Sequence, residues 1–169
     1  MITRRRLLGS LLGLAVMPSL SCSEPTEPEG ERPELYKSRS EWQKLLSPAA
    51  FSVLFNAGTE VPGSSPLNDE HRAGTFICAA CFIPLFSSET KYESGTGWPS
   101  FWQPIAGRLG LKPDLSTGEV RTEYHCIRCG GHQGHRFDDS PPPTGLRHCN
   151  NGVALLFVSS AESLPALRT

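Results

Sequence analysis

The chain has 169 residues, 38% of them hydrophobic, and a formal net charge of −1 at pH 7. A chain of this length can form one domain with its own core and is too short for two comfortable ones. Its 15 prolines and 16 glycines, with few long apolar runs, favour short strands and turns over a helix bundle, so we expect a mainly β protein.

Residues 1–21 have the pattern of an export signal. A basic stretch, Arg4 to Arg6, precedes an apolar run from Leu7 to Met17, which is shorter than the about 20 residues that span a bilayer. The sequence TRRRLL resembles a twin-arginine signal, which would export the protein folded and already metal-loaded. An ordinary secretory signal is the alternative. Both predict a protein of the periplasm or cell envelope.

Residues 22–34 are predicted to form a disordered tether rich in proline and glutamate. PSLSC resembles a lipoprotein cleavage site that would place a lipid on Cys22, although Ser19 stands where a leucine is usual; simple cleavage nearby is the alternative. Cleavage before Cys22 would remove three arginines and no acids, leaving 13 basic and 17 acidic residues and a charge of −4. Such an acidic surface argues against nucleic acid as a partner.

Two short helices are predicted at the start of the folded domain, residues 35–169. Ser38 and Glu41 have the spacing of a capping box. Ser47 and Pro48 suit the N-cap and first turn of a second helix. Five apolar side chains of this region are predicted to pack in the core: Trp42, Leu45, Leu46, Phe51 and Leu54.

Short strands are predicted over residues 75–78, 119–126 and 153–158. The middle segment alternates Val120, Thr122 and Tyr124 with Arg121, Glu123 and His125. This period of two is typical of a half-buried antiparallel strand with its polar side chains facing outward.

Four cysteines form two C-x-x-C pairs separated by residues 82–125, namely Cys78 with Cys81 and Cys126 with Cys129. Each pair can supply two thiolates to a tetrahedral Zn²⁺, with Zn–S distances of about 2.3 Å. The alternatives are two disulfides or a thioredoxin-like redox pair, which would need a βαβ context. We expect one structural zinc ion, with His125 a strand residue rather than a ligand.

A sixth cysteine, Cys149, stands alone in the segment GGHQGHRFDDSPPPTGLRHCNN. The histidines of this segment could form a second metal site, or could supply acid and base chemistry beside a reactive thiolate. The rigid turn at residues 94–102, SGTGWPSFW, is costly to keep for packing alone, although packing is the alternative for Phe101 and Trp102.

Taken together, these motifs resemble the B-type methionine sulfoxide reductases over residues 40–158. The resemblance implies two curved antiparallel sheets with a few short N-terminal helices and a structural zinc site. It also implies reduction of the R epimer of methionine sulfoxide, free or in proteins, to methionine. The rival hypothesis is a zinc-stabilised binding module of the cell envelope that has lost catalysis.

The resemblance implies a role for each residue of the site. Cys149 is the nucleophile, its thiolate favoured by Arg147, and Asp139 orients Arg147 or the histidines. A sulfoxide oxygen is a poor leaving group and needs a proton, which His132 and His135 supply with help from Asn151. Trp98 offers a ring face to the S-methyl group of the substrate.

Three positions depart from the family pattern. His148 stands where a tyrosine is usual, and Asn150 replaces an aliphatic residue; both could alter the pocket, or add a titrating group near Cys149. Thr96 occupies the position of the resolving cysteine of many relatives. We therefore expect a monomer whose sulfenic acid is reduced by an external, thioredoxin-like thiol. Cys22, if free of lipid, is the alternative resolving thiol.

Overall fold

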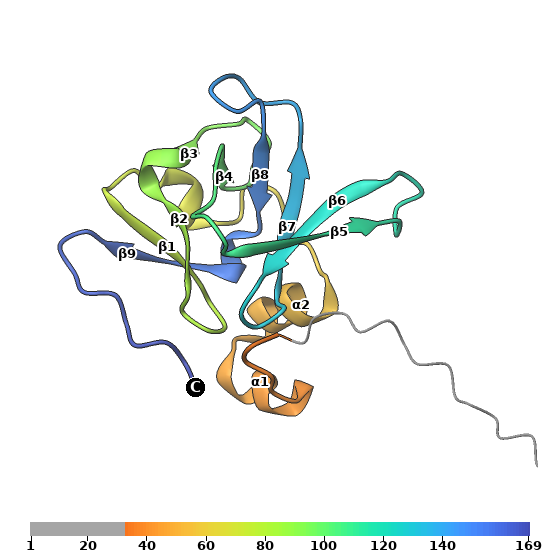
Figure 1. Ribbon diagram of the computed structural model, residues 1–169, viewed down its shortest axis with the longest axis vertical. Coiled ribbons are helices and arrows are strands. Elements are labelled where there is room, and N and C mark those ends of the chain that lie inside the picture. Colours follow the sequence, from red (N-terminus) through yellow and green to blue (C-terminus); the bar gives the residue numbers. More distant parts are fainter. Residues whose placement is uncertain (1–32) are drawn as a thin grey trace, which may run out of the picture. The chain divides into compact units, whose positions relative to one another are not determined.

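The computed structural model describes residues 33–169 (Figure 1). The predicted export signal and residues 22–32 of the predicted tether, with Cys22, lie outside the described residues. Within residues 33–169 no helix combines the length and the apolar character needed to cross a membrane.

Two short helices precede the sheets, as predicted. Helix α1, Arg39–Leu45, begins at a capping box in which the Ser38 backbone N–H donates to Glu41 at 2.7 Å. Helix α2, Pro48–Asn56, begins at Ser47, whose hydroxyl accepts from the Ala50 backbone. The prediction for Leu45 was wrong, because its side chain is 44% exposed. A helix of seven residues makes only about two turns, and Trp42 is the residue that it buries in the core.

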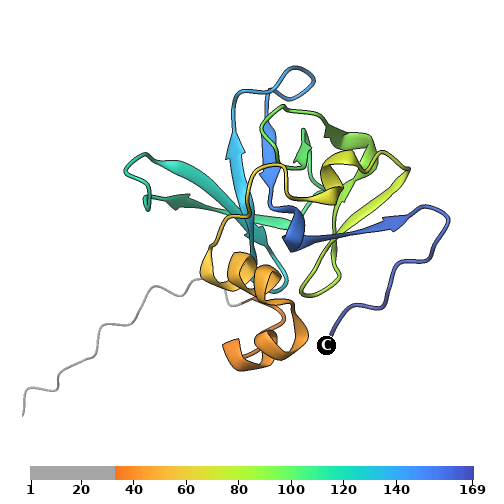
Figure 2. The same cartoon turned by 180° about the vertical axis from the view of Figure 1, so that it is seen from behind.

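Within the part of the chain that the structure describes, nine strands form two antiparallel sheets, which confirms the predicted fold class (Figures 1 and 2). The three-stranded sheet has the order β2 (Pro84–Ser87), β1 (Gly74–Cys78), β9 (Leu155–Ser159). The six-stranded sheet has the order β3 (Lys91–Tyr92), β4 (Ser100–Phe101), β8 (Arg147–Asn150), β7 (His132–Phe137), β6 (Arg121–Cys126), β5 (Leu109–Asp114). Short 3₁₀ turns lie at η1 (Pro66–Asp69), η2 (Ser88–Thr90) and η3 (Gly152–Ala154).

Aromatic side chains from both sheets form the centre of the core. Phe86 of β2 stacks on Phe101 of β4 with ring centroids 4.1 Å apart, and Phe76 of β1 meets Phe101 edge to face. All three rings are fully buried, as is Tyr124 of β6. Since burying one such ring contributes about 1.5–3 kcal/mol, these contacts hold the two sheets together.

The prediction for residues 119–126 was partly wrong. Strand β6 begins only at Arg121, and Val120 is 77% exposed at the end of a hairpin turn. Tyr124 faces the core as expected, but Glu123 on the opposite face is also buried. Its carboxylate lies 3.1 Å from the Lys112 ammonium and 3.0 Å from His132 Nδ1, and these partners offset the cost of removing a charge from water. The strand predicted at 153–158 starts at Leu155, after η3.

Candidate functional site

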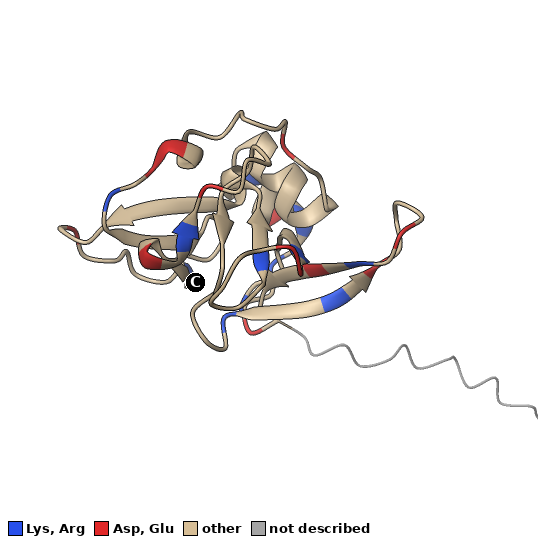
Figure 3. Cartoon of the chain, turned by 90° about the horizontal axis from the view of Figure 1, so that it is seen from above, with Lys and Arg blue, Asp and Glu red and all other residues tan. Residues whose placement is uncertain are grey.

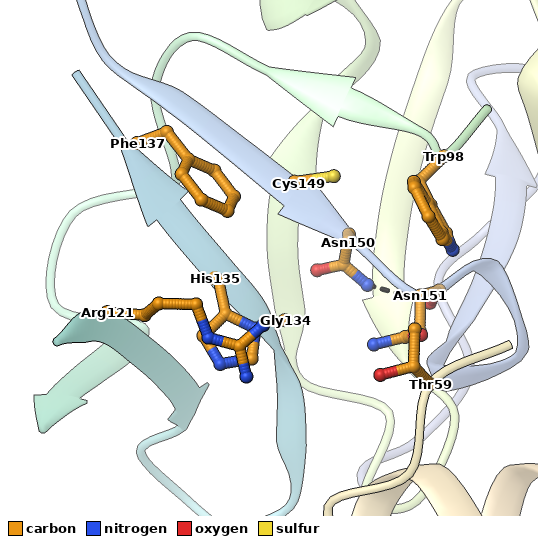
Figure 4. A pocket seen from close by; sticks show the side chains of 9 residues that line it. All are labelled: Thr59, Trp98, Arg121, Gly134, His135, Phe137, Cys149, Asn150 and Asn151. Carbon is orange, nitrogen blue, oxygen red and sulfur yellow. Dashed lines mark hydrogen bonds between the residues drawn. The ribbon is translucent and has the colours of Figure 1, made fainter. Parts of the chain in front are cut away.

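Cys149 lies on β8 in the wall of a cavity of about 110 Å³ and is half-buried. Figure 4 shows its sulfur between the rings of Phe137 and Trp98, with His135 on the neighbouring strand. The other lining residues are Thr59, Arg121, Gly134, Asn150 and Asn151. The cavity therefore combines apolar ring faces, a thiol and an imidazole.

A β-bulge in β7 brings the two histidines to the face that carries Cys149. Tyr124 pairs with Gly134 while His125 pairs with His132, so Gln133 is an extra residue in the ladder. In a regular strand residues 132 and 135 would point to opposite faces, and the extra residue places them on the same face. His135 is directly opposite Cys149 in the pairing of β7 with β8.

Gly134 allows β7 and β8 to approach closely beside Cys149. A Cβ atom at this position would lie 1.9 Å from the Cys149 carbonyl oxygen, so any side chain would push the strands apart. The glycine between the two histidines therefore keeps His135 and Cys149 in register.

The two histidines occupy different positions in the site. His135 lines the cavity, and its Nε2 lies 2.7 Å from Asp114 Oδ2 on β5. His132 is 4% exposed, lies behind His135 with ring centroids 5.4 Å apart, and does not line the cavity. Its Nδ1 lies 3.0 Å from Glu123, close enough for an ion pair although neither ring nitrogen makes a well-directed hydrogen bond.

Arg147 is held by Asp139 through two hydrogen bonds, Nε to Oδ1 at 2.8 Å and Nη2 to Oδ2 at 2.6 Å. These bonds lower the pKa of Asp139 and raise the pKa of Arg147. The guanidinium also lies 4.3 Å from the centroid of the Phe137 ring. Arg147 thus bears a fixed positive charge two residues from Cys149 on the same face of β8.

Arg147 and Asp139 line a second cavity, of about 230 Å³, rather than the first. Thr96 also lines this second cavity, and its hydroxyl lies 3.8 Å from Cys149 Sγ. The position expected for a resolving residue is therefore beside Cys149, and a hydroxyl occupies it.

Glu60, in the loop after α2, organises one side of the site and was not predicted from the sequence. Its carboxylate accepts from the backbones of Gly152 and Val153, at the start of η3. Its backbone carbonyl accepts from Trp98 Nε1 at 3.2 Å, and its N–H donates to Asn151 Oδ1 at 3.0 Å. The loop therefore fixes Trp98 and Asn151 together. An isolated glutamate in a loop gives no local signal of such long-range contacts.

The two departures at positions 148 and 150 are accommodated in the core. The pKa of His148 is lowered to about 4 by burial, so the imidazole is neutral at pH 7 and stacks edge to face on Tyr124. Asn150 is fully buried and accepts from the Tyr124 hydroxyl at 2.9 Å. The suggestion that His148 adds a charge beside Cys149 is wrong, because neighbouring residues of a strand face opposite sides.

The four paired cysteines form a cluster whose geometry fits zinc. Their sulfur atoms are buried and all lie within 4.8 Å of one another, with Cys78 to Cys129 at 3.7 Å and Cys81 to Cys126 at 3.5 Å. Four thiolates at about 2.3 Å from a tetrahedral zinc are about 3.8 Å apart. His125 is not a member of this cluster, and all five cysteines described in residues 33–169 are free rather than disulfide-bonded.

The site therefore has a half-buried thiol near an imidazole and a paired arginine, on a β fold that contains a four-cysteine metal site. This combination is that of a thiol-dependent redox enzyme. Comparison with known proteins specifies its family. Residues 46–159 match the SelR domain. The chain is 49% identical over 125 residues to the peptide methionine sulfoxide reductase MsrB of Leptospira interrogans, covering 73% of this chain and 95% of that protein.

Two further relatives carry the same name. The protein of Thioalkalivibrio sulfidiphilus is 51% identical, covering 68% of this chain and 85% of its own length. The protein of Methanosarcina barkeri is 50% identical, covering 75% and 89%. The chain therefore belongs to the SelR domain family, that of the MsrB methionine sulfoxide reductases.

Proposed function

We propose that this protein reduces the R epimer of methionine sulfoxide, free or in proteins, to methionine. The observation that carries the proposal is the position of Cys149, with its sulfur between two aromatic rings and His135 directly across the strand pair. The apolar rings of Trp98 and Phe137 suit the S-methyl group. We assign the His135 imidazole, which lines the same cavity, to the sulfoxide oxygen.

In this reaction the Cys149 thiolate attacks the sulfoxide sulfur while His135 supplies a proton to the oxygen. Oxygen passes from the substrate sulfur to the cysteine sulfur, so the products are methionine and a sulfenic acid on Cys149. Arg147, held by Asp139, stabilises the thiolate, and Asn151 helps to place the substrate. His132, which does not line the cavity, supports the ring of His135.

The rival function, a zinc-stabilised binding module without activity, would retain the four cysteines of the metal cluster. It would not need an accessible thiol and an imidazole lining one cavity, nor a paired arginine two residues from that thiol, and the chain has all three. The decisive assay incubates purified zinc-loaded protein with each sulfoxide epimer and dithiothreitol. We expect methionine from the R epimer only, and no product from either epimer would refute the proposal.

We also propose that an external, thioredoxin-like thiol recycles Cys149. The support is Thr96, whose hydroxyl beside Cys149 cannot form a disulfide with a sulfenic acid. Two thiols of the reductant would convert the sulfenic acid back to the thiol, releasing water and a disulfide. The chain needs no partner copy for this cycle, and we propose that it acts as a monomer.

Recycling can be tested by treating mature protein with one equivalent of R sulfoxide and no reductant. We expect a sulfenic acid on Cys149 that dimedone traps, detected by peptide mass spectrometry. Thr96→Cys is the matched variant, and it should yield a disulfide between residues 96 and 149 instead. A disulfide between Cys22 and Cys149 in the unchanged chain would overturn both external recycling and a lipid on Cys22.

Finally, we propose that the protein is exported to the periplasm or cell envelope, either anchored there by a lipid on Cys22 or released by simple cleavage nearby. The support is the basic and apolar pattern of residues 1–21 and the Pro/Glu-rich segment 22–34. Fractionation of cells should find a processed chain outside the cytoplasm. Full-length chain confined to the cytoplasm would contradict the proposal.

A further inference from the structure

The hairpin formed by β5 and β6 presents a row of charged side chains to the histidines of β7. Cross-strand pairs place Asp114 opposite Arg121 and Lys112 opposite Glu123 on one face. Figure 3 shows acidic and basic segments together along this hairpin. Because side chains directly opposite in an antiparallel pair are about 5 Å apart, each carboxylate is fixed by a cation.

Each carboxylate also reaches one histidine. Asp114 Oδ2 lies 2.7 Å from His135 Nε2 and 2.6 Å from Arg121 Nη2. Glu123 Oε1 lies 3.0 Å from His132 Nδ1 and 3.1 Å from Lys112 Nζ. Only the group around Asp114 reaches the cavity, because its partners His135 and Arg121 line the cavity wall. The partners of Glu123 do not line this cavity.

We propose that Asp114 is a positioning residue that holds the His135 imidazole by Nε2 and so leaves Nδ1 as the ring nitrogen available to substrate. This inference rests on the proposed function, because it assigns the orientation of the acid in that reaction. When Nδ1 gives its proton to the sulfoxide oxygen, the neutral ring keeps the Nε2–H that donates to Asp114. The carboxylate therefore selects one tautomer and stabilises the imidazolium before transfer.

The charges around His135 support this assignment. Burial lowers the pKa of His135, Asp114 opposes that shift, and Arg121 and His132 add to it. Glu123 and Cys149 are its register partners on β6 and β8. The pKa of Asp114 is itself lowered, first by the backbone and hydroxyl of Ser116 and then by His135 and Arg121. Asp114 therefore opposes the effect of burial on His135 and favours the protonated ring, which is the form that can supply a proton.

The test uses two variants that should move the His135 pKa in opposite directions. Asp114→Asn removes the charge that raises this pKa, so the pKa should fall; Arg121→Met removes a charge that lowers it, so the pKa should rise. NMR titration of the imidazole signals in zinc-loaded protein measures both, with His135→Gln used to assign the signal. Glu119→Gln removes an exposed charge from the same hairpin and should change nothing.

Kinetics provide the second measurement. Asp114→Asn should lower the single-turnover rate of methionine formation about 10- to 100-fold at pH 8, move its pH profile to lower pH, and leave KM nearly unchanged. An unchanged His135 pKa and rate in Asp114→Asn would overturn the proposal. If the His135 pKa shifted in the same direction in both variants and the hairpin lost its fold, Asp114 would have only a structural role. That outcome would also overturn the proposal. Since the titration needs no activity, an inactive wild-type protein would refute the proposed function and leave this test intact.

Discussion

Replacing Cys149 by serine is expected to abolish reduction of the R sulfoxide. A serine hydroxyl at neutral pH is almost entirely protonated, and its oxygen cannot accept the substrate oxygen to give a stable analogue of a sulfenic acid. The rate of methionine formation should therefore fall by more than about 10⁴-fold, which is the scale of loss when a nucleophile is removed from a set of catalytic residues that act together. Single-turnover formation of methionine, measured with one equivalent of substrate, is the appropriate measurement.

The fold of the Cys149→Ser variant should be intact, because the side chain is half-buried and is not a member of the metal cluster. Zinc content and thermal midpoint should match those of the unchanged protein. Cys22→Ser is the matched control, since it changes a cysteine to which no part in the attack on the substrate is assigned, and it should leave the single-turnover rate unchanged. Measurable turnover by Cys149→Ser would exclude Cys149 as the nucleophile.

Local patterns in the sequence were sufficient for features that depend on nearby residues. The capping box of α1 needs only Ser38 and Glu41, and the C-x-x-C pairs fix the spacing of two thiols on one turn. Each motif carries its own geometry, and the structure confirms the helix starts and the cysteine cluster.

The remaining features depend on register, which local patterns do not specify. Asp114 reaches His135 only because β5, β6 and β7 pair in a particular alignment with one extra residue, Gln133. A shift of one residue in the pairing of a strand would turn each of its side chains to the opposite face of the sheet. Glu60 contacts residues about 90 positions away in the chain, so nothing near it in the sequence indicates its role.

The bulge links the metal cluster to the reactive face. Gln133 is fully buried, and its Nε2 donates to Cys78 Sγ at 3.4 Å while its Oε1 accepts from Asn150 Nδ2 at 3.3 Å. Its backbone carbonyl accepts from both the N–H and the side-chain amide of Asn151. The residue that turns His132 and His135 to the same face is thus anchored to a metal-binding cysteine, so the cluster supports the geometry of the site as well as the fold.

Loss of the metal should consequently unfold the protein rather than slow one chemical step. Structural zinc binding supplies about 10–16 kcal/mol, which equals or exceeds the about 5–15 kcal/mol by which domains of this size are stable. Cys78→Ser and Cys129→Ser should each lose zinc by elemental analysis and lose the cooperative thermal transition seen by circular dichroism. Cys149→Ser, with the same chemical change outside the cluster, should keep one zinc per chain and its transition. Folded, cooperative protein that contains no zinc would show that the four cysteines do not hold the fold through a metal.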